Sequence, residues 1–294
     1  MSAPRSPTPK PRTASTKINV LEPGLYLVAT PIGNLRDITL RALDVLGGAD
    51  LILAEDTRVT GKLLAAHGLS GKLERYDEHA AHRARPKVLG ALAAGAKVAL
   101  VSDAGTPLVS DPGYRLVREV VELGLAVHPI PGASALLAGL TVAGLPTDRF
   151  LFAGFPPPKT AARRAFFQEL APVRATLVFY EGGSRLAASL ADMAAVFGAR
   201  EGAVARELTK LHETVIRGPL ADLAADPRLD DPKGEIVVLV GPGAQRAATE
   251  DEAQTALAEA LTRVGPAEAA SEVSKALGLP RRDLYARAIA LKAR

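Results

Sequence analysis

The chain has 294 residues, of which 48% are hydrophobic and 23% charged, with a formal net charge of +4. A chain of this length is long enough to form two domains, and this proportion of hydrophobic to charged residues allows a sizeable hydrophobic core. The absence of cysteine excludes disulfide bonds, thiolate metal ligands and cysteine nucleophiles, and no apolar run is long enough to span a membrane.

Residues 1–21 are predicted to form a disordered basic leader. Residues 1–17 are rich in Pro, Ser, Thr, Lys and Arg and lack the apolar segment of a signal peptide. We therefore expect a cytoplasmic protein. The modest positive charge raises the expectation of a polyanionic partner only slightly above the base rate.

Residues 22–148 are predicted to form an N-terminal α/β domain in which a strand, a special turn and a helix alternate four times. Such alternation predicts a mainly parallel sheet covered on both faces, with ligands bound beyond the carboxyl ends of its strands. Residues 75–86 are expected to be a polar loop, followed by a helix over 87–94. The expected strands are 24–29, 49–54, 97–102 and 126–130.

Residues 149–243 are predicted to form a second α/β domain with a mixed sheet, because short turns join several of its strands. The expected strands are 150–155, 175–180, 203–207 and 234–241, and a basic helix is expected over 160–170. Residues 208–216 could extend the third of these strands or pair with it as a hairpin.

Residues 244–294 are predicted to be a helical C-terminal extension, rich in Ala, Glu and Arg, with helices over 252–263, 266–277 and 282–291. The turn at Gly278-Leu-Pro280 gives the last two a helix-turn-helix spacing. Such a pair could bind nucleic acid, but two packed surface helices are the commoner meaning.

Several nucleotide and catalytic motifs are missing. The first strand is not followed by G-x-G-x-x-G, and no G-x-x-x-x-G-K-[S/T], H-E-x-x-H or G-x-S-x-G occurs. These absences argue against a dinucleotide fold, a P-loop hydrolase, a zinc hydrolase and a serine hydrolase. The five histidines lack metal-ligand spacing, so no metal site is expected.

The turns that follow the strands carry a family resemblance. They include Thr30-Pro-Ile-Gly-Asn34, Glu55-Asp-Thr-Arg58, Asp103-Ala-Gly-Thr-Pro107, Ser110-Asp-Pro-Gly113, Pro131-Gly-Ala-Ser134, Phe152-Ala-Gly-Phe155 and Arg206-Glu-Leu-Thr-Lys210. In this order, over about residues 24–241, the chain resembles the rRNA small subunit methyltransferase I family of the tetrapyrrole methylase superfamily. It departs from that family's usual pattern at Gly182-Gly183.

The resemblance implies a homodimer of subunits with two α/β domains, and S-adenosylmethionine bound in the cleft between the domains. It implies 2′-O-methylation of a cytidine in the decoding region of 16S rRNA, with free rRNA or the 30S subunit as substrate. The cofactor would be held mainly by main-chain groups of glycine and proline turns. The residues assigned to it are Pro31, Gly33, Asp103, Gly105, Thr106, Pro107, Pro131, Gly132, Ala133, Ser134, Tyr180, Ala205 and Gly234. The strand after Gly234 is expected to complete the adenine side together with Tyr180 and Ala205.

Methyl transfer to a ribose hydroxyl needs an aligned attack and an acceptor for a weakly acidic proton. The candidate catalytic residues are Glu55, Asp56, Lys210 and Glu213, and Glu181 and Glu207 are further proton acceptors to consider. A lysine serves as a base only where its pKa is lowered. Helix capping is the structural alternative for the first two residues, and an exposed charged hairpin is the alternative for Lys210 and Glu213.

Basic residues in the predicted loops and helix starts could neutralise RNA phosphates while a ribose enters the pocket. For any one of them, ordinary solubility is the commoner explanation. The candidates are Arg36, Arg58, Lys62, Arg75, Arg83, Lys159, Arg163, Arg164 and Arg185.

Two alternative functions stay open from sequence. The same fold could methylate a small tetrapyrrole precursor, which is also acidic. A non-catalytic RNA-binding or ribosome-assembly protein is disfavoured, because binding alone would not require special turns at every strand exit.

Overall fold

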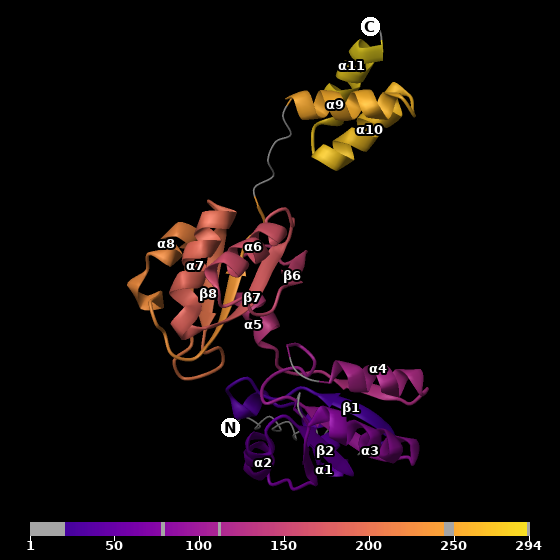
Figure 1. The fold of residues 1–294 in the computed structure, drawn as a ribbon, viewed down its shortest axis with the longest axis vertical. Helices are drawn as coiled ribbons and strands as arrows, with labels where there is room; N and C mark the ends of the chain where they lie inside the picture. Colours follow the sequence, from indigo (N-terminus) through magenta and orange to yellow (C-terminus); the bar gives the residue numbers. More distant parts are fainter. Residues whose placement is uncertain (1–20, 78–79, 111–112, 244–249, 293–294) are drawn as a thin grey trace, which may run out of the picture.

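The computed structural model describes residues 21–77, 80–110, 113–243 and 250–292. The predicted leader, apart from residue 21, lies outside the described residues. The described chain forms two five-stranded sheets with flanking helices, followed by three C-terminal helices (Figure 1). The predicted fold class, two α/β units and a helical extension, is confirmed.

The first sheet has the strand order β3-β2-β4-β1-β5, and all of its strand pairs are parallel. Its strands are β1 (Gly24–Val28), β2 (Leu51–Ala54), β3 (Leu73–Arg75), β4 (Lys97–Val101) and β5 (Val127–Ile130). The accompanying helices are η1 (Leu35–Asp37), α1 (Leu40–Gly48), α2 (Thr57–Ala66), α3 (Ala81–Ala93), α4 (Tyr114–Glu122) and α5 (Ala135–Val142).

Alternate residues of these strands enter two different hydrophobic clusters. Leu25, Leu53 and Leu100 pack with α3 and α4, whereas Val28 and Ile52 pack with α1 and α2. Because successive side chains of a strand point to opposite faces, the sheet is buried on both sides. This burial explains why its strands are short apolar runs.

The second sheet is mixed, with the order β6-β7-β10-β8-β9; only β6 and β7 pair in parallel. Its strands are β6 (Phe150–Phe152), β7 (Thr176–Gly182), β8 (Glu201–Arg206), β9 (Thr214–Pro219) and β10 (Glu235–Val240), and its helices are α6 (Thr160–Leu170), α7 (Gly183–Phe197), α8 (Leu220–Ala224) and η2 (Pro227–Leu229). β9 pairs antiparallel with β8, so the hairpin alternative is the correct one.

The last three helices are α9 (Glu250–Leu261), α10 (Pro266–Leu277) and α11 (Arg281–Lys292), and they enclose a hydrophobic cluster of their own. Figure 1 shows them as a separate group that follows the last strand of the second sheet. No helix among the described residues has both the length and the apolar character that crossing a membrane requires.

The expectation of a polar loop over 75–86 is wrong at Arg75 and from Ala81 onward. Residues up to Arg75 form β3, and α3 already begins at Ala81. β3 has only three residues at the sheet edge, too few for a strand pattern to be visible. The Asp77 carboxylate accepts a hydrogen bond from the Ala80 backbone N–H at 2.6 Å, which supports the early helix start.

Candidate functional site

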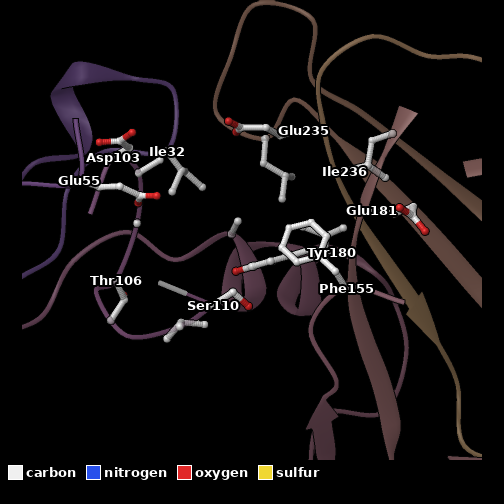
Figure 2. Close-up of a pocket in the computed structure, with 16 residues that line it drawn as sticks. Ile32, Glu55, Asp103, Thr106, Ser110, Phe155, Tyr180, Glu181, Glu235 and Ile236 are labelled. Atoms are coloured by element: carbon white, nitrogen blue, oxygen red, sulfur yellow. The ribbon is translucent and has the colours of Figure 1, made fainter. Parts of the chain in front are cut away.

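A cavity of about 350 Å³ lies between the two sheets and is lined from both (Figure 2). This volume is in the range of small-molecule sites. The lining residues are Ile32, Glu55, Asp103, Ala104, Gly105, Thr106, Val109, Ser110, Ala135, Phe155, Tyr180, Glu181, Leu208, Glu235, Ile236 and Val237.

The first sheet presents the carboxyl ends of its strands to this cavity. Glu55 directly follows β2, and Asp103 lies two residues after β4. Thr30 and Gly105 exchange backbone hydrogen bonds of 2.9 and 3.0 Å, which tie the loop after β1 to the loop after β4. Gly105 has a φ of 83°, a conformation that favours glycine, so the backbone here comes close to the cavity.

A second link joins the loops after β4 and β5. The Thr106 hydroxyl donates to the Ala133 carbonyl at 3.1 Å. Ser134 is the N-cap of α5, as the sequence predicts, and accepts from the Leu137 N–H. The predicted cofactor turns are therefore fastened to one another at one edge of the sheet.

The second sheet supplies an aromatic and aliphatic wall. The Tyr180 ring makes edge contacts with Phe152 and Phe155, with centroid distances of 4.8 and 5.6 Å. The Leu136 N–H donates to the Tyr180 hydroxyl at 3.2 Å. Val237 of the adjacent strand β10 is the register partner of Tyr180 and lines the cavity beside it.

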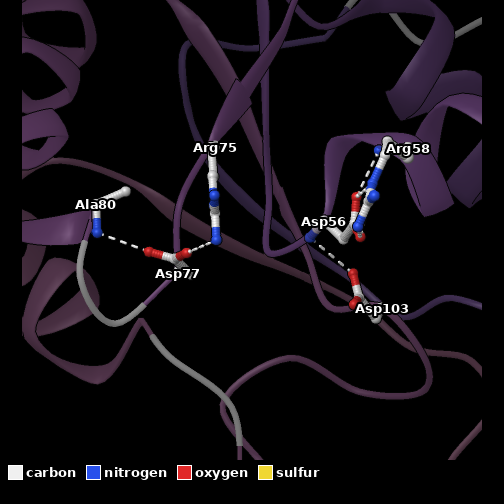
Figure 3. A network of polar contacts seen from close by, with 6 residues as sticks. All are labelled: Asp56, Arg58, Arg75, Asp77, Ala80 and Asp103. Carbon is white, nitrogen blue, oxygen red and sulfur yellow. Dashed lines mark hydrogen bonds and ion pairs between the residues drawn. The ribbon is translucent and has the colours of Figure 1, made fainter.

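Carboxylates line the opposite side of the cavity. Burial, together with the charges of Asp103 and Asp77, raises the pKa of Glu55 above its ordinary value. Asp103 accepts a hydrogen bond from the Asp56 N–H at 2.9 Å, so its position is fixed (Figure 3). Glu55 thus combines access to the cavity with a pKa moved toward neutrality, as a proton acceptor requires.

Asp56 has a structural role instead. Its carboxylate accepts from the backbone and the guanidinium of Arg58, as Figure 3 shows, and it is the N-cap of α2. These hydrogen bonds hold the pKa of Asp56 far below its ordinary value. Such a carboxylate is a weak base, so the capping alternative describes Asp56 better than catalysis.

Lys210 is also unsuited to be a base. Burial alone would lower its pKa, but hydrogen bonds and charges from Glu207 and Glu235 outweigh burial and raise it. Its ammonium lies 2.8 Å from Glu207 and 3.2 Å from Glu235. Two carboxylates therefore hold Lys210 as a cation, which argues against the base role considered for it. Glu213 accepts from the Thr209 N–H at 2.6 Å and holds this loop.

The predicted cofactor residues fall into three groups. Asp103, Gly105, Thr106 and Tyr180 line the cavity. Pro31, Gly33, Pro107 and Pro131 to Ser134 adjoin lining residues in the same loops. Ala205 is buried and is the register partner of Val237 on the neighbouring strand, and Gly234 packs against Glu207.

Several residues that line the cavity were not among the predicted site residues: Ile32, Ala104, Val109, Ser110, Ala135, Phe155 and Leu208. Ile32, Ser110 and Phe155 belong to the motifs quoted above, so the motifs themselves could have pointed to them. Glu235, Ile236 and Val237 belong to the strand after Gly234, which was expected on the adenine side.

Most of the predicted RNA-binding residues are exposed: Arg36, Arg58, Lys62, Arg75, Arg83, Lys159 and Arg164. Arg185 is half-buried and pairs with Glu181. The prediction for Arg163 is wrong. Only 3% of this residue is exposed, and its guanidinium binds the buried carboxylate of Asp192 at 2.8 Å. The i, i+4 spacing of Arg163 and Phe167 places both on the inner face of α6.

Comparison with known proteins gives two family matches. Residues 24–224 match the family described as Tetrapyrrole (Corrin/Porphyrin) Methylases, and residues 247–292 match the RsmI C-terminal HTH domain.

Curated relatives match over most of the chain. The Ribosomal RNA small subunit methyltransferase I of Erythrobacter litoralis is 56% identical over 92% of this chain and 96% of that protein. The protein of the same name from Mesorhizobium japonicum is 50% identical over 92% and 93%. A solved structure, uroporphyrin-III C-methyl transferase from Thermus thermophilus complexed with S-adenyl homocysteine, has 22% identity and a TM-score of 0.51, covering 74% of this chain and 96% of that one. At this identity, the likeness supports the fold.

Proposed function

Because the chain belongs to the rRNA small subunit methyltransferase I family of the tetrapyrrole (corrin/porphyrin) methylases, we propose that it methylates 16S rRNA with S-adenosylmethionine. The acceptor is the 2′-oxygen of a cytidine ribose in the decoding region. Membership of the family makes the protein a methyltransferase. The identity of the cofactor, of the methylated nucleotide and of the acceptor atom is what we propose.

The observation that carries the proposal is the cavity between the sheets, because its chemistry suits each part of the cofactor. The aromatic and aliphatic wall of Phe155, Tyr180 and Val237 suits adenine. Backbone groups around Gly105 can approach a polar chain without an intervening Cβ. The Glu55 and Asp103 carboxylates provide negative charge for a sulfonium and an ammonium. The residues present therefore fit S-adenosylmethionine.

When bound, the cofactor supplies a methyl group on a sulfonium sulfur; the methyl moves to the ribose oxygen, and S-adenosylhomocysteine remains. The chain's part is to orient the two reactants and to accept the hydroxyl proton. We assign proton acceptance to the Glu55 carboxylate, since it lines the cavity and its pKa is raised. Lys210, as a fixed cation, holds the loop after β8 against the loop after β1.

Neither alternative function is favoured. The curated methyltransferase I relatives are 43–56% identical over most of the chain, whereas the solved uroporphyrin-III C-methyl transferase reported above shares 22%. A non-catalytic RNA-binding role leaves unexplained why a carboxylate with a raised pKa faces a cavity of cofactor size.

The proposed partners are rRNA, in the 30S subunit or free, and a second copy of the chain in the cytoplasm. Large apolar side chains are exposed on α4, α5 and β6, where a second subunit would cover them: Tyr114, Val121, Leu137, Phe150 and Leu151. The proposed domains are residues 22–148 and 149–243, with the cavity between them, and residues 244–294 as an extension.

Two measurements test the proposal. Isothermal titration calorimetry with S-adenosylhomocysteine should show one site per chain. Tritium from labelled S-adenosylmethionine should appear in 16S rRNA when 30S subunits from a strain lacking the gene are the substrate. Cofactor binding without transfer to either 30S subunits or free 16S rRNA would remove the RNA assignment and favour a tetrapyrrole substrate.

A further inference from the structure

The three C-terminal helices form a unit with its own core. Ala253, Leu257, Val273, Leu284 and Ala288 belong to a cluster that shares no residue with the clusters of the two sheets. No residue of this unit lines the cavity. Any contribution of this unit to function must therefore come from its exposed residues.

The turn between α10 and α11 fixes the direction of α11. Gly278 ends α10 in the left-handed conformation, with a φ of 67°, and its N–H donates to the Ser274 carbonyl at 2.9 Å. The Ser274 hydroxyl donates to the Leu279 carbonyl at 2.7 Å. Leu284 and Ala288 then face the core, and the opposite side of α11 faces solvent.

At the start of α11, the exposed Arg281 adjoins an outer face that consists of Arg282, Tyr285, Ile289 and Lys292. Their spacing of three, four and three residues places them on one side of the helix. All four are exposed, including 44% of Tyr285 and 47% of Ile289. Tyr285 and Ile289 do not belong to the hydrophobic cluster of the three helices, and basic side chains lie on either side of them along α11.

The charges of α11 are unequal: it has Arg281, Arg282, Arg287 and Lys292 against Asp283 alone. Arg287 pairs with Glu250 at 3.0 Å, whereas Arg281 and Arg282 have no ion pair within the described part of the chain. Both lie in the first turn, where the helix dipole disfavours cations. Their position does not stabilise α11, so the two arginines remain available to a partner.

We propose that the outer face of α11 binds RNA and anchors the substrate outside the methyl-transfer cavity. Arginine and lysine neutralise backbone phosphates, and an exposed tyrosine ring stacks on an unpaired base. This combination of charge and ring suits RNA better than an apolar protein surface. The inference rests on the proposed function, which makes RNA the substrate.

The test compares full-length Arg281→Glu/Arg282→Glu with the full-length wild type. Glutamate in the first turn suits the helix dipole, so the variant should fold, as circular dichroism would verify. Filter binding to 16S rRNA should weaken by about tenfold or more, and the dependence of log K on log salt should lose about 1.5 from its slope, as expected for two lost phosphate contacts. In methyl transfer the KM for RNA should rise, while kcat and cofactor affinity stay as in the wild type.

A matched control is Lys72→Glu/Arg174→Glu, which makes the same change in net charge. These exposed residues precede β3 and β7, at the ends of the strands away from the cavity. The control should bind RNA like the wild type. Tyr285→Phe should keep RNA affinity, and Tyr285→Ala should lose it.

Equal RNA affinities for the arginine variant and the control would overturn the inference, whether or not the enzyme transfers methyl groups. If the arginine variant alone loses RNA affinity and the wild type transfers no methyl group to RNA, the anchor stands and the proposed reaction is wrong.

Discussion

The side chain of Lys210 crosses directly over Gly33. A Cβ placed on Gly33 would lie 2.3 Å from the Lys210 Cγ, so only glycine allows this approach. The ammonium of the same lysine is held by Glu207 and Glu235 of the second sheet. One lysine therefore closes the two halves of the molecule on each other beside the cavity.

Gly33→Ala should separate these loops, since a methyl group at this position displaces the Lys210 stem. We expect S-adenosylhomocysteine to bind about tenfold more weakly by calorimetry, with kcat less affected. In Gly33→Ala/Lys210→Ala the collision is absent, so part of the affinity should return. If the affinity losses of the two single variants simply add in the double variant, the contact between these residues does not matter for binding.

Glu55→Gln should remove the proton acceptor. We expect kcat to fall by about 100-fold or more, with a much smaller loss of S-adenosylhomocysteine affinity because the Asp103 carboxylate stays at the cavity. In the wild type the base must be ionised, so kcat/KM should fall as the pH drops through a pKa above 4.5, and the variant should lack this limb. Methyl-transfer assays stopped at fixed times between pH 5 and 8 would measure kcat and the pH dependence of kcat/KM. A variant with normal kcat would exclude Glu55 as the acceptor.

The same substitution should raise stability. Because the pKa of Glu55 is higher in the folded chain than its ordinary value, the folded state binds the proton more tightly. The unfolding free energy from this residue is therefore greatest at low pH and falls as pH rises through the raised pKa. At neutral pH, Glu55→Gln should melt at a higher temperature than the wild type. Asp56→Asn is the control and should melt lower, since the Asp56 carboxylate caps α2 and its pKa is depressed.

Tyr180→Ala should weaken cofactor binding, because it removes the ring that packs on Phe152 and Phe155 at the cavity wall. We expect a loss of about tenfold in affinity for S-adenosylhomocysteine, compared with about twofold for Tyr180→Phe, which keeps the ring. If the alanine variant binds S-adenosylhomocysteine as tightly as the wild type, adenine does not bind against this wall.

Arg163→Ala should affect stability rather than RNA binding. It leaves Asp192 buried with one fewer partner, which should cost about 3 kcal/mol in the free energy of urea unfolding. Arg164 also pairs with Asp192 but is about half exposed, so Arg164→Ala should cost about 1 kcal/mol or less. RNA affinity should be unchanged in Arg163→Ala; a loss of affinity without a loss of stability would restore the original assignment.

The fold was predictable wherever a strand is buried on both sides. Apolar runs such as those of β1 and β4 stand out against their glycine and proline turns, and Thr160–Leu170 was located to the residue. β3 was not predictable, because three residues at a sheet edge are too few to show the alternation of apolar and polar residues that marks a strand. α3 begins after a turn that is held by the Asp77 carboxylate, and a turn of this kind is clear only once the backbone is known.

The candidate site was predictable where backbone geometry leaves a trace in sequence, as at Gly105 and Ser134. Much of the apolar lining was not, since Val109 and Leu208 differ from other apolar residues only by what faces them. Charge alone could not separate Arg163, which is buried against Asp192, from its exposed neighbour Arg164. The sequence likewise could not decide among the candidate bases, because that choice depends on the hydrogen-bond partners of Lys210 and Asp56.

The most direct test of the account is to locate the methyl group. 30S subunits from a strain lacking the gene would be treated with the purified enzyme and S-adenosylmethionine, and the 16S rRNA digested and analysed by mass spectrometry. We expect one added methyl group on the ribose of a cytidine in the decoding region, absent with Glu55→Gln. A methyl group on a base, or none on rRNA despite cofactor binding, would contradict the account.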